Sequence, residues 1–193
     1  MVKGGRGSDF IEGDRGEDWI RAFTGGDGLS GGPDSDYIKG GWGLDDIDGG
    51  DGADVLWGGA DVDILDGEGG SDFLGANGGF GGRLSGGEGD DTLDAGKTHH
   101  LELIGGSGDN VLWGAAAFSP DFSSGSGDDQ VYGTPSDDII KTGSGDDYIR
   151  SYGGDDWIEA GGDIDDVDAG EGDDDCFDAE SPQNCEFVSS HSG

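Results

Sequence analysis

From Gly4 to Gly75 the polar and apolar positions recur every nine residues, in eight consecutive units without an insertion. Aspartate stands at the sixth position of every unit and isoleucine or leucine at the eighth, while glycine is common at the first, second and fourth. A single apolar residue between mostly polar neighbours predicts a short strand that buries only its middle side chain. The glycine-rich positions predict turns, because glycine adopts positive φ without a steric penalty.

The units read GGRGSDFIE, GDRGEDWIR, AFTGGDGLS, GGPDSDYIK, GGWGLDDID, GGDGADVLW, GGADVDILD and GEGGSDFLG. This is the pattern G-G-x-G-x-D-x-U-x, and the chain resembles the RTX family of calcium-binding nonapeptide repeats over almost its whole length. The resemblance implies an all-β fold, a right-handed parallel β-roll in which two nonapeptides form one coil and calcium lies between stacked turns.

The residues themselves favour the same structure. An aspartate every nine residues, among glycines that expose backbone carbonyls, offers the oxygen ligands that a hard cation such as Ca²⁺ requires. One unit cannot bury its apolar side alone, so the units must stack. We therefore expect about nine to ten coils, and at roughly 4.8 Å per coil a roll about 45 Å long.

The nine-residue spacing changes after Gly75 in an orderly way. Units of ten residues at 76–85, 95–104 and 114–123 alternate with units of nine, and regular nines resume until Phe177. We expect leader residues at 1–3, a single roll over 4–177, and a C-terminal cap and tail over 178–193. Within the roll, 4–75 and 133–177 are regular, and 76–132 forms three 19-residue coils with metal-poor loops on one edge.

Successive units lie on opposite edges of a roll, so the predicted metal ligands separate into two rows. One edge carries Asp18, Asp36, Asp54, Asp72, Asp91, Asn110, Asp129, Asp147 and Asp165. The other carries Asp9, Asp27, Asp45 and Asp63, then the three metal-poor loops, then Asp138, Asp156 and Asp174. An ion between each pair of adjacent turns gives at most about 13 Ca²⁺ ions. The neutral Asn110 is expected to weaken its two intervals.

The charge balance limits the function. With 45 acidic and 9 basic residues, the 193-residue chain has a formal net charge of −36. That excludes nucleic acid as a partner, since phosphate binding needs a basic surface. Without metal, such an acidic and glycine-rich chain is expected to be disordered. About 13 divalent ions would bring the net charge to about −10, so folding and calcium binding are expected to be one event.

The expected location is extracellular, as a secreted or surface protein. No run of 18 apolar residues indicates membrane insertion. Met1 leads directly into the first repeat and leaves no room for a signal peptide, so we expect either a part of a larger parent protein or another export route. A monomer is expected.

One outer face is unexpectedly apolar. The strands after the uninterrupted row expose Trp19, Tyr37, Val55, Trp57, Phe73, Val111, Trp113, Tyr132 and Tyr148, with Arg21, Lys39 and Arg150 beside them. Three interpretations remain open: cross-strand aromatic ladders that stiffen the sheet, a surface for a partner or neighbouring domain, and a platform for the sugar rings of a glycan.

The ten-residue units gather Phe80, Arg83, His99, His100, Phe118 and Asp121 on one edge. Paired histidines suggest a transition-metal ligand or a base. The alternative is that these loops replace calcium with apolar packing. No nucleophile elbow or other catalytic motif occurs, so we expect no enzyme and no catalytic residue.

Cys176 and Cys185 lie nine residues apart at the C-terminal end. Carrying the nine-residue register one unit further places Cys185 on the opposing strand, pointing inward, where a disulfide would close the open end of the roll. Two buried free thiols are the alternative. We expect the bond, with 178–188 folded over the last coil as a lid.

Together these features predict a calcium-binding β-roll that folds on binding several Ca²⁺ ions and serves as a structural and folding module. The alternative is a calcium-dependent module that binds a carbohydrate or a partner domain through the aromatic face.

Overall fold

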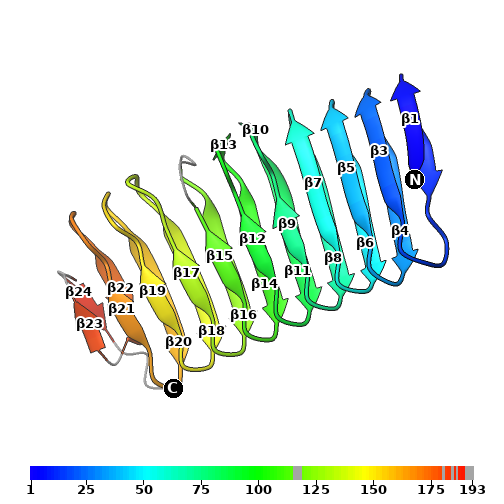
Figure 1. Cartoon of the computed structure of the whole chain (residues 1–193). Coiled ribbons are helices and arrows are strands. Elements are labelled where there is room, and N and C mark those ends of the chain that lie inside the picture. Colours follow the sequence, from blue (N-terminus) through cyan, green and yellow to red (C-terminus); the bar gives the residue numbers. More distant parts are fainter. Residues whose placement is uncertain (115–118, 180, 184, 186, 190–193) are drawn as a thin grey trace.

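The chain winds as a β-solenoid of parallel strands. A computed structural model describes residues 1–114, 119–179, 181–183, 185 and 187–189. Consecutive strands alternate between two eleven-stranded sheets, so the chain makes about ten coils, with β1 at one end and β23 and β24 at the other (Figure 1). The described part of the chain contains no helix long and apolar enough to cross a membrane.

The two large sheets form the opposite walls of the roll. Sheet A contains β1 (Val2–Arg6), β3 (Trp19–Thr24), β5 (Tyr37–Trp42), β7 (Val55–Ala60), β9 (Phe73–Gly75), β12 (Thr92–Asp94), β15 (Val111–Trp113), β17 (Gln130–Tyr132), β19 (Tyr148–Arg150), β21 (Asp166–Asp168) and β23 (Ser181–Gln183). Sheet B contains β2 (Phe10–Glu12), β4 (Gly28–Pro33), β6 (Asp46–Asp51), β8 (Asp63–Gly69), β11 (Gly82–Glu88), β14 (Glu102–Ser107), β16 (Asp121–Ser126), β18 (Ile139–Ser144), β20 (Trp157–Gly162), β22 (Asp175–Phe177) and β24 (Phe187–Ser189). A small third sheet joins β10 (Gly79–Phe80) to β13 (Thr98–His99).

The core is a double stack of aliphatic side chains, one from each strand. In sheet A, Ile20 lies opposite Ile38, and Ile38 opposite Leu56, at a spacing of 18 residues. The side chains at the eighth repeat position are buried in both sheets, from Ile11 to Cys176. The predicted stacking of units and the all-β fold are therefore confirmed.

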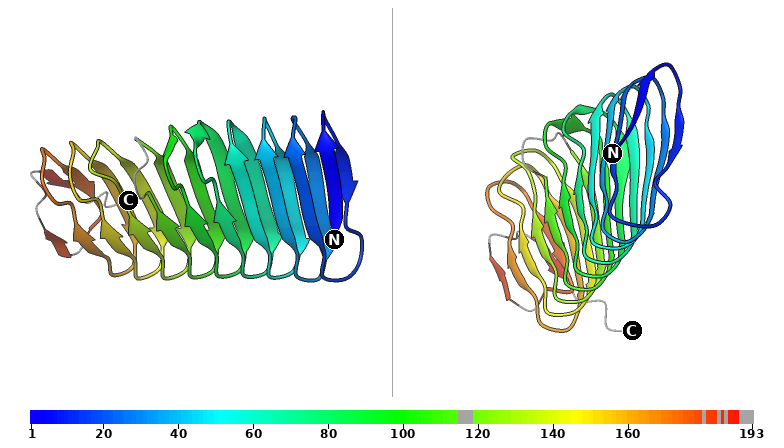
Figure 2. Two further views of the ribbon diagram at one scale, coloured as in Figure 1. Left: turned by 45° about the horizontal axis from the view of Figure 1, so that its top comes forward. Right: turned by 45° about the vertical axis from the view of Figure 1, so that its right-hand side comes forward.

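The spacing between neighbouring coils increases in the middle of the roll. Leu74 pairs with Leu93 and Leu93 with Leu112, each 19 residues further on. Sheet B makes the same change between Leu65 and Phe122. The extra residue of each coil lies on the edge that carries β10 and β13, and the turns of the other edge stay regular along the whole roll (Figure 2).

Each unit has a second inward position besides that of the aliphatic residue. The expectation that only one side chain per strand is buried is therefore wrong. The first residue of the next unit also points its side chain inside, both where the strand includes it, as in β3 and β18, and where the strand ends one residue earlier, as in β19. Ala22, Thr142 and Ser151 at this position are almost completely buried. Elsewhere glycine stands here because a side chain has no room: a Cβ on Gly49 would lie 2.6 Å from Oδ2 of Asp54.

The C-terminal segment adds a shorter coil to the roll. β23 pairs with β21 and β24 with β22, so that Pro182 lies opposite Val167 and Val188 opposite Cys176. The expected register of Cys185 is therefore wrong, because Pro182 takes that place and Cys185 falls between β23 and β24. The segment continues both sheets as another rung.

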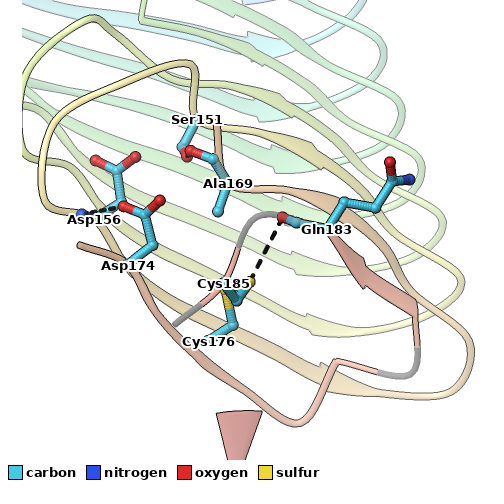
Figure 3. Close-up of a disulfide and its surroundings, with 7 residues drawn as sticks. All are labelled: Ser151, Asp156, Ala169, Asp174, Cys176, Gln183 and Cys185. Carbon is cyan, nitrogen blue, oxygen red and sulfur yellow. Dashed lines mark hydrogen bonds between the residues drawn. A yellow bond between two sulfur atoms is a disulfide. The ribbon is translucent and has the colours of Figure 1, made fainter. Parts of the chain in front are cut away.

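Cys176 and Cys185 nevertheless form the predicted disulfide, with a Cα–Cα distance of 6.0 Å (Figure 3). Opposed sheets lie about 10 Å apart, too far for this bond. The shortened coil places Cys185 beside the core instead, where it packs half-buried against it.

We predict that reducing this disulfide loosens the C-terminal coils first. The bond joins residues only nine positions apart, so it restricts only the end of the chain in the unfolded state, and its loss should cost about 2–3 kcal/mol of local stability. Hydrogen exchange of calcium-loaded protein, with and without reductant, should show faster exchange in β21 and β22 and unchanged exchange in β5 and β7. Uniform acceleration, or two free thiols by mass in unreduced protein, would contradict this.

A candidate calcium ladder

The turns place the sixteen predicted ligands in two rows, one along each edge of the roll. Fourteen of these side chains are buried, at 0–5% exposure. Asp9 and Asp18, in the first turns, are half-buried. Burying carboxylates in stacked positions is unfavourable unless each charge has a partner. The contacts of the two oxygen atoms show what kind of partner is needed.

In all of these buried residues except Asp138, one side-chain oxygen accepts a hydrogen bond from the preceding coil. The backbone N–H of Asp36 donates to Oδ1 of Asp54 at 2.6 Å, and the N–H of Asp54 donates to Oδ1 of Asp72 at 2.8 Å. The same bond joins Asp156 to Asp174 at 2.9 Å (Figure 3). These bonds repeat along both rows, so every Oδ1 in this chain of contacts is fixed by backbone.

The other oxygen has no donor. Among the described residues, the buried Oδ2 atoms without a hydrogen-bond partner belong to Asp9, Asp27, Asp36, Asp45, Asp54, Asp72, Asp91, Asp129, Asp147 and Asp156. A buried polar atom without a partner is rare in folded proteins. Its repetition in coil after coil indicates one missing partner of a single kind.

Backbone carbonyl oxygens face the same points. The place that a Cβ of Gly49 would occupy lies 2.6 Å from Oδ2 of Asp54 and 3.1 Å from the carbonyl oxygen of Gly67, one coil further. Two acceptors that converge without a donor repel each other unless a cation lies between them. Oxygen ligands from carboxylates and carbonyls are those that Ca²⁺ prefers.

Most ligands in such a site must come from the backbone. Within the described part of the chain, no three Asp, Glu, His or Cys side chains converge in a way that could hold a metal. The carboxylates of neighbouring coils can supply two side chains to an interval, and turn carbonyls must complete the coordination. The residues therefore fit a calcium ion with mixed carboxylate and carbonyl ligands, and they do not fit a zinc-type cluster.

Comparison with protein families matches the RTX calcium-binding nonapeptide repeat at residues 3–38, 39–74, 77–97, 102–117, 123–156 and 150–177, which is most of the chain. The chain belongs to this family. No curated protein matches the sequence. Membership explains the buried carboxylate rows, because repeats of this family bind calcium.

Asn110 shows how the RTX ladder continues where the carboxylate is missing. Its Oδ1 accepts from the N–H of Asp91 at 3.0 Å, as an aspartate would. Its Nδ2 donates to the carbonyl oxygens of Gly108 at 3.0 Å and Ser124 at 3.3 Å. The amide hydrogens thus bind carbonyl oxygens that in other coils face an Oδ2 atom without a donor. The polar atoms of the Asn110 side chain are therefore hydrogen-bonded without a cation.

Asp138 is the second departure from the pattern. Its Oδ2 accepts the N–H of Thr134 at 2.6 Å, and its Oδ1 accepts the Thr134 hydroxyl at 2.9 Å. Both oxygens of this predicted ligand are therefore bound within its own turn. The sequence shows Thr134 in place of the usual second-position glycine. The hydrogen bonds from Thr134 to Asp138 were not predicted from it.

Hydroxyl groups modify the RTX turns of the C-terminal half in a similar way. Thr142 Oγ1 donates to the carbonyl of Ala160 at 2.5 Å, and Ser151 Oγ donates to the carbonyl of Ala169 at 2.6 Å. These carbonyls belong to the first position of the next coil, which is the position that faces Oδ2 in the N-terminal half. The C-terminal turns therefore offer fewer free carbonyl oxygens to a cation.

Burial changes the acidity of the ladder. Desolvation raises the pKa of Asp63 and Asp72 to about 7, and that of Asp54 to about 6, although the backbone N–H bonds oppose the shift. Burial also raises the pKa of Asp91 and Asp129 to about 6. Near neutral pH and without a cation, the ladder holds its charges at a cost in stability.

The interrupted edge contains apolar packing. The rings of Phe80 and His99 stack at 4.9 Å between β10 and β13, with Phe80 75% exposed, and the neighbouring Leu101 is buried. Arg83 pairs with Asp66 at 3.8 Å, and Asp121 and His100 are exposed. Phe118 lies outside the described residues. Among the described residues of this edge, no three metal-binding side chains converge, so the structure lends no support to a metal site in these loops.

The aromatic residues of sheet A form stacked pairs. Trp19 and Tyr37 stack at 4.9 Å, and Trp113 and Tyr132 at 4.0 Å. The ring stacking that a cross-strand ladder requires is therefore present in these pairs. Trp19 nevertheless remains 59% exposed.

Acidification should partly replace calcium in metal-free protein. The folded-state pKa values near 6 and 7 lie above the ordinary value near 3.8, so the folded state binds protons that the unfolded state releases. This contribution to stability is full below the unfolded pKa and is lost as pH rises through about 6–7. Calcium-free protein followed by circular dichroism should gain β structure between about pH 8 and pH 5. More β structure at the higher pH would contradict the prediction.

We predict that Asn110→Asp adds a calcium site and weakens the calcium-free state. The carboxylate would keep the Oδ1 contact but lose the amide donors to Gly108 and Ser124. Calcium counted by elemental analysis should rise by about one ion per chain, while calcium-free protein should lose β structure. Gln130→Glu is the control, since it adds the same charge on an exposed side chain. An unchanged ion count for Asn110→Asp would contradict the assignment.

Proposed function

We propose that this chain is a calcium-folded structural module of a secreted or surface protein, in which Ca²⁺ ions bind between successive turns. The observation that carries the proposal is the row of buried Oδ2 atoms that face carbonyl oxygens without a donor. The ligands are the aspartates of the two rows, with the N-terminal coils as the strongest sites.

The number of ions follows from the same contacts. The thirteen intervals counted from the sequence are an upper limit. Asn110 completes its rung with hydrogen bonds, and the Asp138 carboxylate is bound by Thr134. We therefore expect fewer ions than thirteen, with most of them between β1 and β12 and on the uninterrupted edge.

Folding and calcium binding are one event in this proposal. A net charge of −36 opposes compaction, and a binding energy that exists only in the folded state stabilises that state. Extracellular calcium modules work at dissociation constants of about 10⁻⁴–10⁻³ M. A chain of this kind stays unfolded at low calcium and folds outside the cell, and the Cys176–Cys185 disulfide suits an oxidising exterior.

The test is the calcium dependence of folding. Circular dichroism in excess chelator should show a disordered chain, and millimolar calcium should produce β structure cooperatively. Magnesium at equal concentration should not replace calcium, because it demands a smaller octahedral site. A β-rich spectrum in chelator at neutral pH would overturn the proposal.

A matched pair of variants locates the ions. Asp54 has ladder residues in both neighbouring coils, whereas Asp63 borders the loop edge and has only Asp45 beside it. Asp54→Asn should therefore lower the calcium-dependent melting temperature more than Asp63→Asn. Both variants keep the Oδ1 acceptor, so the comparison reports the loss of cation ligands. Equal losses would mean that the two rows are not arranged as proposed.

A further inference from the structure

Three basic side chains stand in register on the outer face of sheet A. Lys3 lies opposite Arg21, and Arg21 opposite Lys39. Like charges directly opposite each other destabilise a sheet. The chain has 45 acidic and only 9 basic residues. Three basic residues in adjacent register positions, without an acidic residue between them, are therefore unexpected.

Other basic residues of the roll do have such neighbours. Arg150 pairs with Asp168 at 4.0 Å on the same sheet, and Lys141 pairs with Glu159 at 3.8 Å on sheet B. Within the described part of the chain, Lys3, Arg21 and Lys39 form no ion pair. Their charges are thus directed to solvent and available to an anionic ligand.

Phe23 adds a second and independent anomaly beside this row. Its φ is +90°, a conformation that costs strain for a residue with a side chain. The residues in register with it are Gly5 and Gly41, which take positive φ without strain. The backbone therefore tolerates Phe23 where its neighbours use glycine, and Arg21 lies over the ring at 4.5 Å.

Arg21, Phe23, Lys39 and Trp42 line a groove with a cavity volume of about 390 Å³, together with the glycines Gly41 and Gly59. Trp42 is 71% exposed. On the other side of Arg21 and Lys39, the stacked rings of Trp19 and Tyr37 line a smaller hollow of about 250 Å³.

We propose that this surface, formed by Lys3, Arg21, Phe23, Lys39 and Trp42, binds a linear glycan that carries carboxylate groups. The basic side chains would bind the carboxylates, and the aromatic rings would stack on sugar faces. The glycines in the groove lining have no side chain that would keep a sugar ring away from the backbone. The cations repeat at the strand spacing of about 4.8 Å, comparable with the length of one sugar unit.

The same features disfavour an acidic peptide. The backbone groups of β3 and β5 are used on both sides, and those of the edge strand β1 are used on the side of β3. A peptide that lies across the sheet face would therefore find no backbone partners there. A glycan needs none. The proposal goes beyond calcium-dependent folding, because calcium enters only by maintaining the roll.

The test is calorimetric titration of the calcium-loaded full chain with a short oligogalacturonate at constant calcium. Its fully methyl-esterified form serves as the neutral ligand of equal shape, and oligoglutamate as the acidic peptide. The oligogalacturonate should bind, more weakly at high salt, and the other two should not. No binding of oligogalacturonate, equal binding of its methyl ester, or equal binding of oligoglutamate would overturn the proposal.

Variants separate the groove from general electrostatics. Arg21→Ser with Lys39→Ser should lower the affinity by at least about tenfold, while Arg150→Ser, which removes a charge from the same sheet, should leave it within about twofold. Trp42→Ala should also weaken binding. Calcium-dependent melting verifies that each variant folds. Equal losses for Arg150→Ser would refute the groove.

Phe23→Gly gives the sharpest comparison. Because it removes a strained residue and restores the glycine of the neighbouring coils, the melting temperature should stay equal or rise, while the affinity for oligogalacturonate falls. A lower melting temperature with unchanged affinity would assign Phe23 to folding and contradict its role in binding.

Discussion

The stacking of carboxylates in register is the constraint on which the roll depends. Each coil places an aspartate over that of the coil before it, about 4.8 Å away. The N–H bond to Oδ1 holds the coils in register, and in doing so it directs Oδ2 toward the carbonyl oxygens of the next turn. The N–H to Oδ1 bond that orders the turns therefore also leaves Oδ2 and the facing carbonyl oxygen without a positively charged partner. The core, with one aliphatic and one small residue per strand, is too thin to outweigh the need for such a partner.

The two halves of the roll meet this need differently. In the N-terminal half the first repeat position is mostly glycine, and the Oδ2 atoms face open carbonyls. In the C-terminal half Thr142 and Ser151 bind those carbonyls. From the middle of the roll onward, an outer row of aspartates also joins the turns, as Asp109 N–H donates to Oδ1 of Asp90 and Asp146 N–H donates to Oδ1 of Asp128. These first-position carbonyls therefore carry more hydrogen bonds in the C-terminal half than in the N-terminal half.

The periodicity of the sequence was sufficient to predict the strands, the aliphatic stack and the two rows of acidic residues, because each depends on spacing alone. The inward first position was not predicted, since it depends on the direction that the chain takes after the ninth residue of each unit. The contacts of Asn110 and Asp138 depend on which oxygen meets which backbone group. The place of Cys185 depends on the shortening of the last coil. None of these follows from a repeat pattern, and each needed the three-dimensional register.

Calcium binding between the turns is tested most directly by a crystal structure of the calcium-loaded protein in which the ions are located by anomalous scattering. Peaks are expected between successive turns of both rows, within ligand distance of Oδ2 of residues such as Asp54 and Asp72, and none is expected beside the Asn110 amide. Peaks confined to the outer row of Asp90, Asp109 and Asp128, or a folded roll without peaks between its turns, would contradict it.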